Sequence, residues 1–198
     1  MTRLIIFILI WILFDSCSGI DKKGIYNPKA IELNEKAVDQ MQRGNNDSAL
    51  ILFDKAIAID ETYYIPHSNK VSIYITRKEF DKALSEMEIV IKKKPDLAEG
   101  WTFTGILNEG LGDTLGAKKY YKKSVEIFDE RIFNPEKKDD IIANRLNRAV
   151  SLILLGKEKD GKEELKKLKT ENPDNNVFDE FLKRNKKEYI NEIFKNAR

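Results

Sequence analysis

The sequence predicts an all-α fold made of repeated helix pairs, and two observations support this expectation. The first is composition: 34% of the 198 residues are charged, and only ten glycines and five prolines interrupt the chain. Such a composition suits long solvated helices better than sheets. The second is an internal repeat, because Ala49, Ala83 and Ala117 follow one another at a spacing of 34 residues.

Each of these alanines stands at the same place in a short pattern. A large side chain follows four residues later, and it is Phe53, Met87 or Tyr121. The small residue lets the second helix of a pair approach the first, and the large residue fills the neighbouring gap. No single pair buries its apolar face, so we expect stacked pairs to form one continuous core.

The period and the pattern resemble the tetratricopeptide repeat, a helix–turn–helix unit of 34 residues. Pro95 closes the second copy and Trp101 opens the third, both at family positions. A fourth copy with Gly161, Leu165 and Pro173 follows an insertion. The resemblance implies a right-handed α-solenoid of about four helix pairs. Within a repeat domain at 29–198, the repeats are expected at 30–63, 64–97, 98–131 and 142–175, with the insertion at 132–141.

The last segment is expected to form a single capping helix at residues 177–197. Phe178, Phe181, Tyr189 and Ile193 recur near helical spacing, with Lys, Glu and Asn between them. This is the pattern of an amphipathic helix. Such a helix would cover the apolar edge of the last repeat, as the end of a repeat array requires.

The N-terminus has the features of an export signal. A short basic start precedes an apolar run from Leu4 to Phe14, which is shorter than the ~20 residues of a membrane-spanning helix and has the length of a signal-peptide core. A segment buried in the protein core is the alternative. The tetrapeptide that ends in Ser16 and Cys17 resembles the bacterial lipobox, and Asp15 is its one departure. The resemblance implies removal of residues 1–16, a lipid anchor on Cys17, and a tether at 17–28.

The lipid would explain the single cysteine. Two or more acyl chains anchor a protein stably, whereas one chain is marginal. The rival interpretation, an exported protein with a free Cys17, leaves a lone thiol in an oxidising space. We therefore expect a lipoprotein of the bacterial cell envelope. Ser18 favours the periplasmic face of the outer membrane, by a sorting rule known in some bacteria.

Composition also argues against several kinds of chemistry. One cysteine excludes a cysteine-cluster metal site, and the single histidine, His67, excludes a histidine-rich one. The sequence has no glycine-rich phosphate loop and no paired-histidine zinc motif. The net charge of +2, from 35 basic and 33 acidic residues, demands no polyanionic partner. We expect no enzymatic activity, cofactor, metal, small-molecule substrate or nucleic-acid partner.

The resemblance implies a protein or peptide partner bound on the concave face that the first helix of each repeat lines. Carried over by position, the lining is Ile31, Asn34, Val38, Met41, Ile65, Ser68, Ser72, Ile75, Glu99, Thr102, Ile106 and Glu109. Chaperone-binding members grip a terminal carboxylate with basic and amide residues. Here the basic residues are missing, and Glu99 would repel a carboxylate. The mixed lining suits an amphipathic helix or an extended segment; the alternative is that part of it belongs to the core or lies under the insertion.

The leading expectation is a membrane-anchored adaptor or scaffold in a bacterial envelope assembly. The alternative is an immunity or inhibitor lipoprotein that neutralises a single toxin or hydrolase. A third is an enzyme accessory or peptidoglycan-associated factor. An adaptor predicts several weaker partners, whereas an immunity protein predicts one tight partner.

Overall fold

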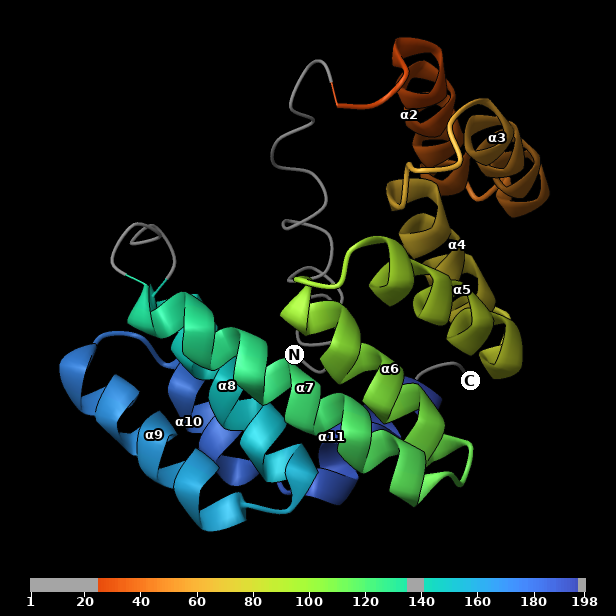
Figure 1. Ribbon diagram of the computed structural model, residues 1–198. Helices are drawn as coiled ribbons and strands as arrows, with labels where there is room; N and C mark the ends of the chain where they lie inside the picture. The colour runs from red at the N-terminus through yellow and green to blue at the C-terminus, as the bar shows by residue number, and fades with distance from the viewer. Residues whose placement is uncertain (1–24, 135–140, 196–198) are drawn as a thin grey trace. The chain divides into compact units, whose positions relative to one another are not determined.

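The computed structural model describes residues 25–134 and 141–195. These ranges hold ten helices, and all their regular secondary structure is helical, which confirms the predicted fold class (Figure 1). The predicted signal segment, Cys17 and most of the tether lie outside the described residues. No helix within the described ranges is long and apolar enough to cross a membrane. The helices form two compact units: the first ends at Pro95 and the second begins at Asp96.

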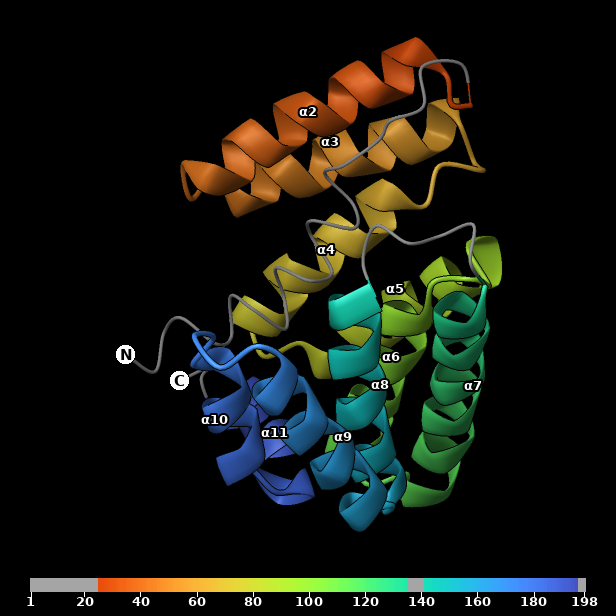
Figure 2. The same ribbon diagram turned by 90° about the vertical axis from the view of Figure 1, so that its left-hand side faces the viewer.

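The first unit consists of two helix pairs. Its helices are α2 (Pro28–Gln42), α3 (Asn46–Ile59), α4 (Ile65–Thr76) and α5 (Phe80–Lys93). α2 lies against α3, α4 lies against α5, and α4 also contacts α2 and α3 (Figure 2). Ala37, Ala49, Phe53 and Ile73 form a core cluster between these helices, and each is at most 1% exposed. The small residue at position 49 and the large one at position 53 thus meet in the core.

The start of α2 is fixed by the residues just before it. The Asn27 side chain accepts a hydrogen bond from the Lys29 backbone N–H at 3.0 Å, and Pro28 occupies the first helical turn. The Asn27 backbone N–H donates to the Asp60 carboxylate at 2.8 Å. The Tyr26 ring lies 4.6 Å from the Tyr63 ring, measured between centroids. The end of the expected tether therefore belongs to the folded unit.

The second unit continues the pattern with two more pairs and two short helices. Its helices are α6 (Ala98–Gly110), α7 (Thr114–Phe133), α8 (Ile141–Leu155), α9 (Glu158–Glu171), α10 (Val177–Lys183) and α11 (Lys186–Lys195). α6 lies against α7, α7 against α8, and α8 against α9 (Figure 1). α10 packs on α9, whereas α11 packs on α6 and α8.

Small residues set the spacing within these pairs. Ala49, Ala83 and Ala117 are fully buried. A Cβ on Gly161 of α9 would lie only 2.5 Å from the Ala149 carbonyl oxygen of α8. Glycine at this position therefore allows the two backbones to approach more closely than alanine would.

The C-terminal segment differs from the expected single capping helix. The chain leaves the helical conformation at Arg184 and Asn185, between α10 and α11. The Asn185 side chain accepts from the Glu188 N–H at 3.1 Å, and the Glu188 carboxylate accepts from the Asn185 N–H at 2.7 Å. This reciprocal capping starts a new helix. At the other side of the break, the Lys162 ammonium donates to the carbonyl oxygens of Leu182 and Arg184, which satisfies carbonyls that the end of α10 leaves free.

Candidate protein-binding face

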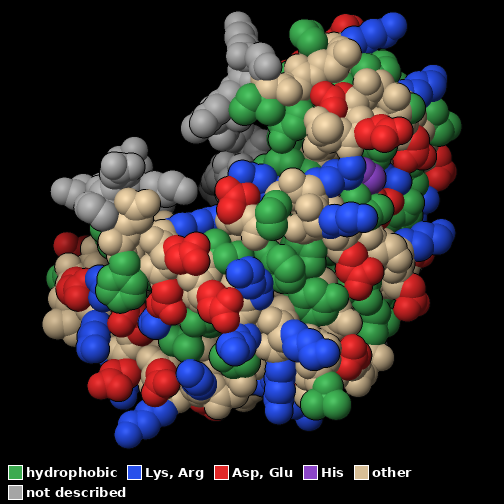
Figure 3. All heavy atoms as spheres, viewed as in Figure 1, with side chains coloured by type: hydrophobic (Ala, Val, Ile, Leu, Met, Phe, Trp, Pro, Cys, Tyr) green, Lys and Arg blue, Asp and Glu red, His purple; other side chains and the backbone are tan. Residues whose placement is uncertain are grey.

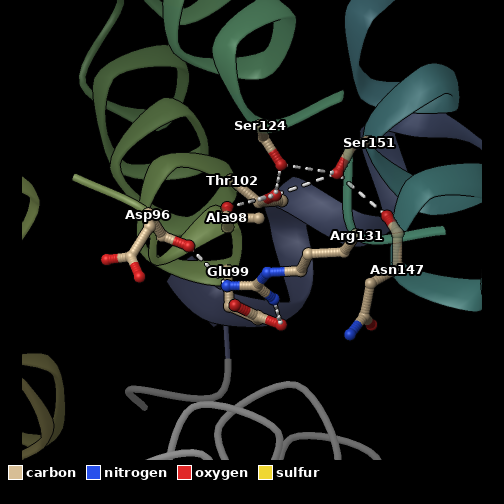
Figure 4. Close-up of polar contacts among 8 residues, drawn as sticks. All are labelled: Asp96, Ala98, Glu99, Thr102, Ser124, Arg131, Asn147 and Ser151. Atoms are coloured by element: carbon tan, nitrogen blue, oxygen red, sulfur yellow. Dashed lines mark hydrogen bonds and ion pairs between the residues drawn. The ribbon is translucent and has the colours of Figure 1, made fainter. Parts of the chain in front are cut away.

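Thr102, expected to line the groove, lies instead in a buried hydroxyl cluster where three helices of the second unit meet (Figure 4). The Thr102 Oγ1 of α6 is 2.6 Å from Ser124 Oγ of α7 and 2.8 Å from Ser151 Oγ of α8. The Ser151 hydroxyl donates to the Asn147 carbonyl oxygen at 2.9 Å. Satisfied hydroxyls of this kind stabilise the packing of α6, α7 and α8. Thr102 is 9% exposed, so it serves the core.

Glu99, another predicted groove residue, is held by an ion pair within its own unit. The Arg131 Nη1 of α7 is 2.8 Å from Glu99 Oε1, and the Arg131 guanidinium also donates to the Asp96 carbonyl oxygen (Figure 4). The Glu99 side chain is 10% exposed and the Arg131 side chain 21%. The acidic charge at this position is therefore already balanced by α7. Ile106, one turn further than Thr102, is 1% exposed and belongs to the core.

Glu109, a predicted groove residue at the end of α6, is paired with a residue of α11. Lys186 of α11 places its Nζ 2.8 Å from Glu109 Oε1 and 5.5 Å from the centroid of the Tyr121 ring. Their side chains are 13% (Glu109) and 26% (Lys186) exposed. The pKa of Tyr121 is raised well above its ordinary value, mainly by burial and secondly by the Glu109 carboxylate. The phenol is protonated at neutral pH.

The other end of α11 is held by an aromatic contact. The Phe194 ring lies over Gly110, the last residue of α6, where a Cβ would come within 1.9 Å of the ring. Between the two ends, Tyr189 is fully buried and Ile193 is 2% exposed. The Tyr189 hydroxyl donates to the Phe181 carbonyl oxygen at 3.0 Å, which ties α11 to α10.

We call the surface of α6 and α8 that contacts α11 the α6–α8 face. It belongs to the first helices of the third and fourth helix pairs, the helices expected to line the groove. In this structure it carries the chain's own C-terminal helix. Phe194 belongs to the apolar side of the expected capping helix, whereas the roles of Lys186 and Gly110 were not predicted from the sequence. A signal was present, because Asn185 followed by Glu188 is the spacing of a capping box and indicates a separate last helix.

The predicted groove residues of the first unit are also largely packed. The Asn69 side-chain amide donates to Asn34 Oδ1 at 2.9 Å, and the two residues are 3% and 7% exposed. Val38 and Met41 are half-buried against the cluster of Ala37, Ala49, Phe53 and Ile73. The remaining positions are the buried Ile65, Ser68 and Ile75 and the half-buried Ile31 and Ser72. Val38, Met41 and Ser72 thus keep part of their surface open on α2 and α4.

A charge cluster, buried except for Asp54, ties three helices of the first unit together. The Glu86 carboxylate of α5 lies 2.6 Å from His67 Nδ1 and 2.6 Å from Lys70 Nζ, both of α4. Lys70 Nζ is also 2.8 Å from Asp54 Oδ1 of α3. Burial acts to raise the pKa of Glu86, but its hydrogen bonds to His67 and Lys70 lower the pKa below the ordinary value. Burial acts to lower the pKa of Lys70, but Asp54 and Glu86 raise it.

The described residues offer little for a metal ion. Within residues 25–134 and 141–195, no group of three or more His, Cys, Asp and Glu side chains is placed to hold one.

Over the second unit, Lys and Arg side chains are interspersed with Asp and Glu on the face shown in Figure 3.

The chain is similar to short parts of longer proteins. No protein-family model matches it. It is 31% identical over 97 residues to the heat shock protein sti1 homolog of Schizosaccharomyces pombe, which is 49% of this chain and 16% of that protein. It is 35% identical over 82 residues to the heat shock protein STI1 of Saccharomyces cerevisiae, or 41% of this chain and 14% of that protein. The match thus spans under a fifth of either relative.

Solved structures share the fold at low sequence identity. A tetratricopeptide repeat protein from Parabacteroides merdae superimposes with a TM-score of 0.57 at 22% identity, over 89% of this chain and 64% of that one. YrrB, described as a TPR protein with an unusual peptide-binding site, superimposes with a TM-score of 0.52 at 16% identity, over 85% of this chain and 84% of that one. The chain therefore has the tetratricopeptide repeat fold.

Proposed function

We propose that this protein binds segments of other proteins and acts as an adaptor at a membrane of the bacterial cell envelope. The observation that carries the binding part is the surface of the first helices: Ser72 of α4 is only half-buried, and the α6–α8 face is already occupied. A helix already lies there, held by a charge contact at Glu109 and by a ring packed on Gly110. Surfaces of this kind bind amphipathic helices through apolar anchors and a few directed polar contacts.

The similarity to repeat-containing proteins supports the same function. One structure with this fold carries a peptide-binding site according to its description. The buried hydroxyls of Thr102, Ser124 and Ser151 are hydrogen-bonded to one another. We therefore propose binding without catalysis.

We do not propose a free terminal carboxylate as the ligand. In chaperone-binding members of the family, side chains at five positions hold the carboxylate. In this chain those positions are occupied by Asn34, Val38, Asn69, Glu99 and Phe103. None of these side chains is basic, and Glu99 is paired with Arg131. Phe103 is 4% exposed. A partner segment that offers apolar and basic side chains matches the described surfaces better.

The membrane part of the proposal rests on the N-terminal sequence. The apolar run from Leu4 to Phe14 and the position of Cys17 directly after it support a lipid anchor. An anchored adaptor would collect its partners at the membrane surface.

Site-specific photo-crosslinking tests the adaptor function and its rival. A photo-reactive residue replaces Ser72, which is half-buried on α4, and in a matched control it replaces Ile51, which is 56% exposed on α3. After crosslinking in intact cells, we expect the Ser72 position to capture several proteins and the Ile51 position to capture none of them. A single partner at Ser72 supports the immunity alternative. Capture of the same proteins at both positions contradicts a binding face on the first helices.

A further inference from the structure

The α6–α8 face and α11 together indicate what kind of partner this face accepts. We propose that α11 is a resident ligand of the α6–α8 face, and that a partner's amphipathic helix with the same pattern replaces it. This inference rests on the protein-binding function proposed above and adds the chemistry of the partner.

The contacts of α11 define the pattern of such a partner. A basic residue in the first turn pairs with Glu109, as Lys186 does at 2.8 Å. A buried aromatic residue follows three positions later, as Tyr189 does, and an apolar residue seven positions after the basic one, as Ile193 does. An aromatic ring at the eighth position covers Gly110, as Phe194 does. These positions lie along one side of a helix, so one amphipathic segment supplies the two contacts with α6 and the two buried side chains between them.

Glu109 and Gly110 are the residues of the face that select this pattern. The Glu109 carboxylate is 13% exposed and lies near the buried Tyr121. A mostly buried carboxylate favours a cationic partner strongly, because leaving it unpaired is costly. Gly110 has no side chain, and any Cβ would occupy the space of the Phe194 ring. The last two residues of α6 thus set one electrostatic and one steric requirement for the helix that binds there.

α11 is built as a separable element. It has its own capping box at Asn185 and Glu188, and two non-helical residues separate it from α10. Its ten residues are fewer than the ~12–15 that an isolated helix needs to be stable in water. Its order therefore depends on its contacts with the rest of the unit, and a competing helix has only those contacts to displace.

Binding of the helix in trans tests the inference. The probe is a fluorescent synthetic peptide of residues 183–195, and the receptor is the full chain in detergent, with anisotropy as the readout. A chain with Lys186→Glu and Phe194→Ala loses both end contacts of its own α11 but keeps the α6–α8 face. We expect it to bind the peptide at least about tenfold more tightly than the wild-type chain, whose tethered helix competes at an effective concentration in the millimolar range.

Two further receptors make the result specific. Lys187→Glu, an equal charge change at an exposed residue of α11, should leave the chain as poor a receptor as the wild type. The Glu109→Lys chain should prefer a peptide that carries Lys186→Glu over the wild-type peptide. This comparison keeps the inference testable if the chain with Lys186→Glu and Phe194→Ala folds poorly. Equal peptide binding by the wild-type chain and by the chain with Lys186→Glu and Phe194→Ala overturns the inference. So does the absence of the swapped preference in Glu109→Lys. Neither result removes the partners captured at Ser72, so failure here is distinct from failure of the adaptor function.

Discussion

At the residue scale, the four helix pairs contain the same turn with one exception. Gly44, Gly112 and Gly156 end the first helices of three pairs with φ of 81°, 103° and 94°. In the second pair Lys78 takes this place, with φ of 60°. A side chain in the left-handed region is strained, which is why glycine is preferred after a helix end.

Lys78→Gly is therefore expected to stabilise the protein. The exposed Lys78 side chain leaves little packing to lose, and the gain should be about 0.5–1 kcal/mol in the free energy of unfolding. Urea unfolding followed by circular dichroism measures it. Lys78→Ala is the control, since it removes the same side chain but keeps the strain. A loss of stability in Lys78→Gly contradicts this explanation of the turn.

The cluster of Glu86, His67, Lys70 and Asp54 is also a residue-scale feature with a measurable role. Lys70→Met leaves the buried Glu86 carboxylate with His67 alone, and we expect a loss of about 3 kcal/mol in unfolding free energy at pH 7. Lys82→Met is the matched control, because Lys82 also lies over the Tyr74 ring but is 63% exposed. Lys82→Met should lower the free energy of unfolding by about 0.5 kcal/mol or less. Equal losses in the two variants contradict a special role for the buried pair.

The same cluster predicts a dependence on pH. The pKa of Glu86 is held below its ordinary value of 4.5 in the folded protein, so its stabilising contribution is complete above that pH. The contribution is lost as the pH falls through the folded-state pKa. The pKa of Lys70 is raised above 10.5, so its contribution is complete below pH 10.5 and is lost as the pH rises further. Between pH 7 and pH 3, urea unfolding should show a smaller loss of stability in Lys70→Met than in the wild type.

At the scale of the element, the sequence pattern predicted helix pairs well and helix ends less well. The period of Ala49, Ala83 and Ala117 reports contacts inside one pair, which are local in sequence. At the break at Arg184 and Asn185, Lys162 reaches across from α9 to hold the end of α10. A contact of this kind has no signature in the helical periodicity of residues 177–197.

Gly161 tests how tightly two elements are packed. Gly161→Ala improves the intrinsic helix propensity of α9 by about 1 kcal/mol. It also drives a Cβ to 2.5 Å from the Ala149 carbonyl oxygen and 2.6 Å from the Ile153 side chain. We expect the steric cost to exceed the gain in helix propensity. The free energy of unfolding, measured by heat or urea, should fall by about 1–2 kcal/mol. Lys166→Ala, at an exposed site of α9, should stay within about 0.5 kcal/mol of the wild type. Stabilisation by Gly161→Ala contradicts the packing described.

At the scale of the whole molecule, the sequence predicted the repeat fold but not which groove positions are open. Thr102 and Ile106 have the family spacing of groove residues, yet both are buried. Family position fixes the helix and its approximate side, whereas burial depends on neighbours such as Ser151 of α8. The pairing of Glu109 with Lys186 joins segments far apart in the chain, and neither residue alone indicates the other.

The location of the whole molecule is expected to depend on one atom, the Cys17 sulfur. Cys17→Ala should release the protein from the membrane fraction, because the acyl chains of the proposed anchor could no longer be attached. Cell fractionation measures the release, and mass spectrometry of the wild-type N-terminus should show a lipid-modified cysteine. Cys17→Ser, which also lacks the thiol, should behave in the same way. Unchanged membrane retention of both variants, or an unmodified cysteine in the wild type, contradicts the anchor.

The α6–α8 face is proposed to bind an amphipathic helix, and α11 is the helix it holds. Backbone hydrogen exchange of residues 189–195 in the wild-type chain tests this most directly, with the free peptide of residues 183–195 as the reference. A docked α11 predicts exchange far slower than in the free peptide, and Phe194→Ala should speed exchange in α11 while α6 and α8 stay protected. Exchange in the wild-type chain as fast as in the free peptide would contradict the claim.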